Sequence, residues 1–337
     1  MRKGALLTSV FCAALFVVST SGQADAILDV LRTSQLDLAT DGKRFLIEEG
    51  KRASFFAVGG LHGDNETTAL VQELWSGLGY QYIVVEMSPW AASRLKVPHL
   101  RGGDIEEPRP HLIIRELSAA NPENRILRSM VEGVKDGYQR KRAPELLKLA
   151  REMGEVQDRL EGGISLKAQV LRTLEVEVAR LETTDRRAAS VQRETFMKQL
   201  FLQHYRAAGT KPKIMAVFGQ SHLGRGIDRR GVSTLGNFIA ELAVTEGVSS
   251  FHVELFAAGG QIFFGGLREL DQRKDEPAFE LLASVARYPA TVFDLRQLRS
   301  LIRRSPQVKL SARDASLLYM ADSYDAVVSY RQVTPAK

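Results

Sequence analysis

The sequence predicts an α/β fold, with a mostly parallel central sheet flanked by helices and a long helical insertion between the two halves of the sheet. Two groups of short apolar runs suit strands, and each group alternates with segments of helical periodicity. Between the groups, residues 111–208 carry apolar side chains at three-and-four spacing, with charged residues on the other faces. The composition, 44% hydrophobic and 26% charged, is that of a globular protein.

The first half of the sheet is predicted to contain a compact β-α-β unit. Such a unit implies that its two strands pair in parallel. The expected elements are an amphipathic helix over residues 27–38, a strand over residues 55–58, a helix over residues 67–78 capped by Asp64 or Asn65, and a strand over residues 82–86.

The helical insertion is expected over about residues 105–210. It begins with an acidic, proline-rich loop at residues 105–110. Gly162 and Gly163 break the helical pattern, and the run Thr183-Thr184-Asp185 suits the start of another helix. The charged faces of these helices suit a solvated surface, and the alternative is a lid that shapes access to a substrate.

The second half of the sheet returns to strand-like runs, so that residues 27–337 form a single α/β domain. The expected elements are strands over residues 213–218, 251–256, 291–295 and 326–330, a helix through residues 238–245 capped by Ser233 or Thr234, and a short hairpin or glycine-rich loop at residues 261–264.

The start of the chain predicts a secretory signal peptide over residues 1–26. Arg2 and Lys3 precede an apolar run at residues 6–18, and Ala24-Asp25-Ala26 suits a cleavage site. An uncleaved anchor is the alternative. With a signal peptide, the mature chain is expected to be periplasmic or secreted. Because the only cysteine, Cys12, lies inside the signal segment, the mature chain is expected to have no disulfide and no thiol nucleophile.

The charge pattern argues against a nucleic-acid partner. The formal net charge is +6, but the basic residues are dispersed among acidic ones, and the short clusters Arg229-Arg230 and Arg303-Arg304 are not interleaved with aromatic residues. No segment after the signal approaches 18 continuous apolar residues, so no further membrane span is expected. A small-molecule or peptide substrate is the expected partner, and the oligomeric state is not indicated.

Two strand-like runs end in the same spacing, a glycine followed three residues later by a histidine. These are Gly59 with His62 and Gly219 with His222, and the strand between them along the chain ends at Glu86. Since ligands of parallel sheets collect beyond the carboxyl ends of the strands, His62, Glu86 and His222 are expected at one rim. The alternative is that both histidines only make backbone hydrogen bonds at strand ends.

Two histidines and a carboxylate allow two kinds of chemistry. They can bind zinc, manganese or iron, with an open position for an activated water. Without a metal, a histidine can act as a general base that Glu86 orients. A serine hydrolase is disfavoured because no Gly-x-Ser-x-Gly run is present, and the glycine run at residues 59–63 lacks the lysine of a P-loop.

Three further residues are candidates for the same site. Glu66 follows His62 by four residues, and the alternative is a favourable helix N-terminal position. Arg225 can hold a substrate carboxylate or oxyanion, with a surface salt bridge as the alternative. Asp294 ends a predicted strand as a further ligand or rim carboxylate, with Arg296 as its expected ion-pair partner.

These motifs resemble the erythromycin esterase-like, ChaN and Tiki (TraB/GumN) superfamily. The paired Gly-x-x-His runs resemble the Tiki branch, while the runs His62-Gly63-Asp64-Asn65-Glu66 and Asp294-Leu295-Arg296 resemble the esterase branch. The resemblance implies a hydrolase of an ester or amide bond, assisted by a divalent metal, or a haem-binding protein of the ChaN type. The esterase branch has glutamate where this chain has Gly59 and histidine where it has Gly219, which puts macrolide ring-opening in doubt.

Overall fold

The computed structural model describes the chain from residue 20 to residue 336 with five gaps. Residues 1–19 of the predicted signal segment and residues 105–109 of the predicted acidic loop lie outside the described residues. The described ranges are residues 20–86, 110–161, 164–183, 185–264, 266–303 and 311–336.

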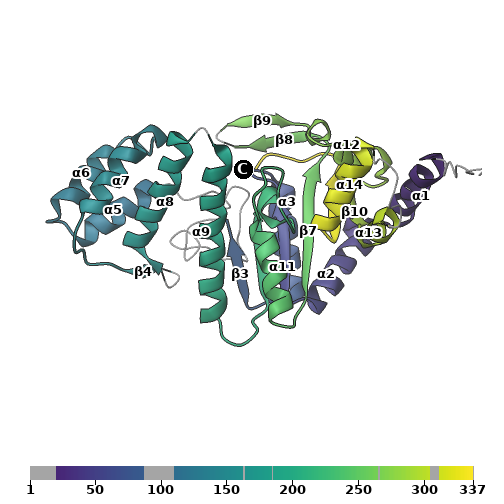
Figure 1. Ribbon diagram of the computed structural model, residues 1–337, viewed down its shortest axis with the longest axis horizontal. Coiled ribbons are helices and arrows are strands. Elements are labelled where there is room, and N and C mark those ends of the chain that lie inside the picture. Colours follow the sequence, from purple (N-terminus) through teal and green to yellow (C-terminus); the bar gives the residue numbers. More distant parts are fainter. Residues whose placement is uncertain are drawn as a thin grey trace, which may run out of the picture.

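A seven-stranded sheet forms the centre of the molecule (Figure 1). Five consecutive strands of the sheet, β11, β7, β2, β6 and β3, are parallel to one another. Strand β10 is antiparallel to both of its neighbours, β11 and the edge strand β1. The predicted mostly parallel α/β fold is therefore confirmed. In sheet order, the strands are β1 (Gln35–Asp37), β10 (Ala290–Asp294), β11 (Ala326–Tyr330), β7 (Ser250–Ala257), β2 (Phe55–Gly60), β6 (Ile214–Gly219) and β3 (Tyr82–Val85).

The order of the strands corrects the predicted β-α-β pairing. Strands β2 and β3 run parallel but do not pair, because β6 lies between them and pairs with both. Gly60 and Gly219 are direct partners in the register of β2 and β6. The strand that follows the insertion thus enters the sheet between the two strands that precede it, which places the second Gly-x-x-His run beside the first.

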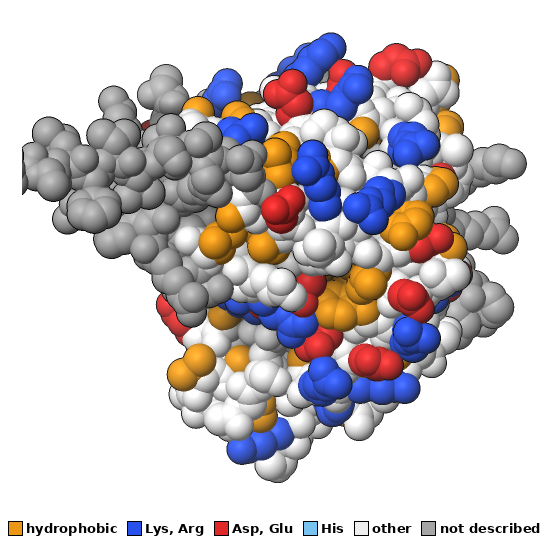
Figure 2. Space-filling model, turned by 90° about the vertical axis from the view of Figure 1, so that its right-hand side faces the viewer, with side chains coloured by type: hydrophobic (Ala, Val, Ile, Leu, Met, Phe, Trp, Pro, Cys, Tyr) orange, Lys and Arg blue, Asp and Glu red, His pale blue; other side chains and the backbone are white. Residues whose placement is uncertain are grey.

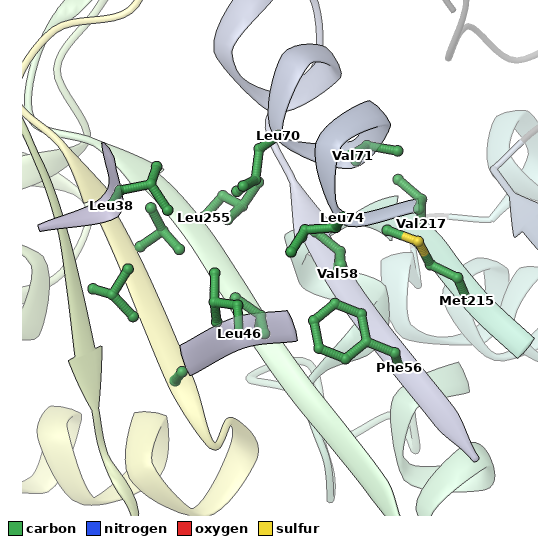
Figure 3. Close-up of a cluster of buried hydrophobic side chains, with 14 of the residues drawn as sticks. Leu38, Leu46, Phe56, Val58, Leu70, Val71, Leu74, Met215, Val217 and Leu255 are labelled. Atoms are coloured by element: carbon green, nitrogen blue, oxygen red, sulfur yellow. The ribbon is translucent and has the colours of Figure 1, made fainter. Parts of the chain in front are cut away.

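Helices cover both faces of the sheet and bury alternate residues of each strand. On one face, α2 and α3 pack Leu46, Leu70 and Leu74 against Phe56 and Val58, a cluster drawn in Figure 3. Burial of such side chains stabilises the fold by about 1.5–3 kcal/mol each. On the other face lie α9 to α12, α14 and α1. The helices outside the insertion are α1 (Thr20–Thr33), α2 (Lys43–Arg52), α3 (Asn65–Leu78), α10 (Gln220–Leu223), α11 (Leu235–Thr245), α12 (Pro277–Val285), α13 (Arg296–Arg303) and α14 (Ala312–Ser323), with short turns at Leu38–Gly42 and Gln272–Lys274.

The insertion lies between β3 and β6, as predicted, and is divided in two. Helices α5 to α8 form a hydrophobic core of their own, and they extend away from the sheet in Figure 1. Helix α9 instead packs Phe201 and Tyr205 against Phe55 of the sheet. The helices are α5 (Pro110–Ala120), α6 (Arg125–Gly133), α7 (Ala143–Glu152), α8 (Leu166–Glu182) and α9 (Arg186–Ala207), with a turn at Arg140–Arg142 and a small hairpin of β4 (Leu160–Glu161) and β5 (Ile164–Ser165) at the predicted glycine break.

Side-chain caps fix several predicted helix starts. Asp64 accepts a hydrogen bond of 2.6 Å from the Thr67 backbone N–H, and Thr234 accepts one of 2.9 Å from Asn237. Asp185 caps α9 through the N–H groups of Arg187 and Ala188. Each bond satisfies a donor that the first helical turn leaves free.

The predicted helix at residues 27–38 is wrong in its second half. Helix α1 ends at Thr33, and Gln35–Asp37 adds β1 to the antiparallel edge of the sheet. Ile27 and Leu31 of the helix are buried against Phe293 and the α12–α14 layer. Pairing with β10 supplies backbone hydrogen bonds that a local periodicity does not reveal.

The hairpin of β8 (Gly260–Phe263) and β9 (Leu267–Leu270) lies above the sheet next to the C-terminal segment (Figure 1). The carbonyl of Gly63 accepts hydrogen bonds from the N–H groups of Phe263 and Ala336. Gly63 has φ of +80°, and a Cβ there would lie 2.0 Å from the Phe263 carbonyl oxygen, so this junction requires glycine.

On the face drawn in Figure 2, basic and acidic side chains are interspersed between apolar ones. No helix in the described part of the chain is both long and apolar enough to cross a membrane.

Candidate functional site

The structure brings His62, Glu86 and His222 together beyond the carboxyl ends of β2, β3 and β6. His62 Nε2 lies 3.6 Å from Glu86 Oε2, and His222 Nε2 lies 3.5 Å from Glu86 Oε1. Glu86 therefore stands between the two imidazoles. This follows from the position of β6 between β2 and β3.

The glycines of the two Gly-x-x-His runs leave room for this arrangement. A Cβ on Gly219 would lie 2.6 Å from His62 Nε2 and 3.1 Å from Glu86 Oε2. A Cβ on Gly59 would lie 3.0 Å from the Cα of Gln220, at the start of the short helix that carries His222. In addition, the Gly219 backbone N–H donates a hydrogen bond of 2.5 Å to Glu86 Oε2. The spacing thus combines a close backbone approach with a donor for the carboxylate.

Helix α9 adds two residues that the sequence analysis did not single out. Arg193 donates to Glu86 Oε1 in an ion pair. Glu194 Oε1 lies 2.5 Å from His222 Nδ1, and its Oε2 accepts the Leu235 N–H at 2.8 Å. A detectable signal existed, because Glu194 shares the spacing of the buried residues Met197, Phe201 and Tyr205 and is therefore a carboxylate on the buried stripe of its helix. We call His62, Glu86, His222, Arg193 and Glu194 the rim site.

The charges around Glu86 favour its ionised form. Burial raises the pKa of this carboxyl, but His222, Arg193, His62 and the Gly219 N–H together lower it below its ordinary value. Both ring nitrogens of His222 face carboxylates, with Nε2 3.5 Å from Glu86 and Nδ1 2.5 Å from Glu194, so these two residues orient the ring.

The two histidines differ in exposure. The side chain of His222 is 6% exposed, whereas that of His62 is 36% exposed. Only His62 of the two therefore offers a substantial surface to a molecule arriving from solvent.

The two carboxylates of the rim site already have polar partners within the protein. Arg193 already places a cation on one oxygen of Glu86, and the Gly219 N–H occupies the other. Within the described ranges, no group of three or more His, Cys, Asp or Glu side chains has the arrangement of a metal site. The donor types suit zinc or manganese, but their present contacts do not fit a bound cation, so we derive no step through a metal.

The structure places the other three predicted site residues away from Glu86. Glu66 accepts hydrogen bonds of 2.8 Å from both the backbone N–H and the hydroxyl of Thr334, and so holds the C-terminal segment. Arg225 forms a partly buried ion pair with Asp325 and donates to the Ser250 carbonyl at the start of β7.

Asp294 ends β10, and β10 is antiparallel to β11, where its partner is Ala326, the first residue of that strand. Asp294 consequently lies at the edge opposite to the rim site. It pairs with Arg296 at 2.7 Å, as expected, and Arg296 also pairs with Glu49 at 2.8 Å.

Comparisons with known proteins identify the fold. No protein-family model and no curated protein sequence matches the chain. Among solved structures, it is similar to a Bacillus cereus protein, with a TM-score of 0.54, 14% identity, and coverage of 93% of this chain and 98% of the other.

Two further solved structures have the same fold. A succinoglycan biosynthesis protein matches with a TM-score of 0.53 and 11% identity, over 94% of this chain and 99% of the other. The erythromycin esterase EreC, solved as a histidine-to-asparagine mutant in its open conformation, matches with a TM-score of 0.52 and 12% identity, over 90% and 96% of the two chains. The chain therefore has the erythromycin esterase-like fold over nearly its whole length, in agreement with the resemblance found in the sequence.

Proposed function

We propose that the protein is an exported hydrolase that uses the rim site to activate water against an ester or amide bond of a small molecule or peptide. The observation that carries the proposal is the placement of Glu86 between His62 and His222, 3.6 Å and 3.5 Å away, at the carboxyl ends of parallel strands. The erythromycin esterase-like fold supports this class of reaction.

His62 is the proposed general base. Its Nε2 faces inward to Glu86, which favours the tautomer with the proton on Nε2 and leaves Nδ1 to accept a proton from water. The resulting hydroxide attacks the carbonyl carbon, and the bond to the leaving alcohol or amine then breaks. His62 returns the proton to the leaving group, so the products are a carboxylic acid and an alcohol or amine.

Arg193 and His222 flank Glu86, Arg193 balances its charge, and Glu194 orients His222 through Nδ1. The ion pair of Arg193 with Glu86 favours this metal-free route over the metal-assisted one that the sequence suggests. Two alternatives are a metal-assisted hydrolase and a haem-binding protein of the ChaN type. The following experiment distinguishes both from the metal-free hydrolase.

The test compares His62→Ala and His222→Ala with His204→Ala, a half-buried histidine outside the rim site that serves as a matched control. Hydrolysis of p-nitrophenyl esters and of peptides is measured with and without chelator, together with bound metal and the absorption spectrum. We expect His62→Ala to reduce kcat/KM by about 10²–10⁴, with no effect of chelator and no effect in the control. Full activity in both rim-site variants would place the chemistry elsewhere, chelator-sensitive activity would establish a metal, and a Soret band would establish haem.

Export rests on the sequence of residues 1–26 and is part of the same proposal. Mass spectrometry of protein recovered from the periplasm or medium should give an N-terminus near residue 27. A chain that retains Met1 would show that the segment is an uncleaved anchor.

A further inference from the structure

The β8–β9 hairpin presents large apolar side chains to solvent beside the rim site. Phe263, Phe264 and Leu267 are 49%, 48% and 60% exposed. Of these three side chains, Phe264 lies on the same face of the hairpin as Arg268, whereas Phe263 and Leu267 are a cross-strand pair on the other face. The Phe264 ring lies 6.1 Å from the His62 ring, measured between centroids, so this one side chain reaches the proposed base itself.

The hairpin is fixed to the loop that carries His62. Phe263 donates its backbone N–H to the Gly63 carbonyl at 2.8 Å, one residue after His62. At the base of the hairpin, the Gln261 N–H donates to the Val333 carbonyl at 3.0 Å. Its apolar side chains are therefore held at a constant place relative to His62, as a contact for substrate must be.

Arg268 stacks on Phe264, with the guanidinium 5.5 Å from the ring centroid. This contact covers one side of the ring and restricts its orientation. Phe264 thus contacts both His62 and Arg268, while about half of its surface remains open to solvent.

From these contacts we propose that Phe264 is a specificity-determining residue whose exposed ring binds an apolar group next to the scissile bond. The proposal rests on the proposed function and names the substrate class as esters or amides with an extended apolar group. The exposed apolar area becomes buried when such a group binds, and each buried methylene contributes to affinity.

The first test measures kcat/KM for p-nitrophenyl acetate, butyrate and octanoate with the wild type, Phe264→Ala and Val244→Ala. Val244 is an apolar residue of α11 that is 80% exposed and serves as the control. The wild type and Val244→Ala should prefer octanoate, and Phe264→Ala should lose about tenfold on octanoate with little change on acetate. An equal loss on all three esters, or no preference for octanoate in the wild type, would overturn the proposal.

The second test separates this proposal from the proposed function. Binding of N-octylacetamide and N-ethylacetamide is measured by calorimetry, with no hydrolysis required. A preference of at least tenfold for the octyl compound that Phe264→Ala removes supports the apolar surface even if the wild type cleaves no ester. Equal binding of both compounds to the wild type, or an unchanged preference in Phe264→Ala, contradicts it whether or not the protein is a hydrolase.

Discussion

The sheet and the α5–α8 part of the insertion each have a hydrophobic core, but only the sheet side contributes to the rim site. Strand ends supply His62, Glu86 and His222 from three neighbouring strands. The α5–α8 core is formed by insertion residues alone, and a cavity of about 340 Å³ between α7 and α8 has none of the rim-site residues in its lining.

Helix α9 is the exception within the insertion. It follows α8 directly along the chain, yet it packs on the sheet and supplies Arg193 and Glu194 to the rim site. The unit that forms the rim site therefore ends between α8 and α9, within the insertion, rather than where the strands stop.

The largest expected effect concerns Glu194, which joins α9 to the rim site. Glu194→Ala leaves the His222 Nδ1 and the Leu235 N–H without their partner, and each buried polar group left unsatisfied costs about 1–3 kcal/mol of stability. We expect hydrolysis to fall at least 100-fold, in kcat more than in KM. Urea unfolding and steady-state kinetics check both effects.

Glu194→Gln is the conservative comparison, because it keeps an acceptor but removes the charge. It should recover most of the stability and part of the activity. Wild-type kinetics in Glu194→Ala would show that Glu194 of α9 has only a structural role, like the residues of α5–α8.

A smaller loss of stability is expected when a leucine-to-alanine substitution creates a cavity in the sheet core or in the α5–α8 core. Leu74 in α3 and Leu146 in α7 are both fully buried, and either change to alanine should cost about 3 kcal/mol. Hydrogen exchange should show Leu74→Ala loosening the sheet strands, while Leu146→Ala loosens α5–α8 and leaves β2, β6 and ester hydrolysis unchanged. Loss of protection in β2 and β6 after Leu146→Ala would mean that the two cores unfold as one.

A smaller effect is expected on the pH dependence of stability, from the buried His252 of β7 in the central sheet. Burial, and then the nearby Arg225, lower the pKa of His252 from 6.5 to about 3, with Asp325 and Arg299 also facing it. The unfolded chain therefore binds more protons between these pH values, and stability falls as the pH drops below 6.5.

At pH 5 the loss from His252 amounts to about 2 kcal/mol, at 1.36 kcal/mol per pH unit. His252→Gln should lose correspondingly less stability between pH 7 and pH 5, which denaturant unfolding at each pH measures. A wild-type stability that does not change over this interval would show that His252 is not kept neutral by burial.

Much of the sheet and the convergence of His62, Glu86 and His222 could be predicted from sequence. The apolar runs before Gly59 and Gly219 and the run before Glu86 identify strands and their carboxyl ends, and the strands proved to share one edge. An apolar run does not reveal the direction of its strand, however. Asp294 was therefore assigned to the same rim, although the antiparallel β10 carries it to the opposite edge.

Residues that act through tertiary contacts were harder to predict. Arg193 lies 107 residues from its partner Glu86, and Glu194 lies 28 residues from its partner His222. The position of Glu194 on the buried stripe of α9 marks it as a buried carboxylate, but no local spacing names the strand end that either residue contacts. Arg225 precedes its partner Asp325 by 100 residues, so its ion pair was not visible either.

The smallest effect is expected from Glu66, which is close to His62 in sequence but bonded to the C-terminal segment. Its two hydrogen bonds to Thr334 are solvent-exposed, so Glu66→Ala should cost about 1 kcal/mol and leave hydrolysis within twofold of the wild type. Glu66→Gln keeps one acceptor and should lose less. Thermal unfolding and ester hydrolysis, measured on the same preparations, separate the two roles. A drop in kcat of tenfold or more at unchanged melting temperature would show that Glu66 belongs to the rim site. Loss of the Thr334 contacts alone could lower the activity only together with the melting temperature.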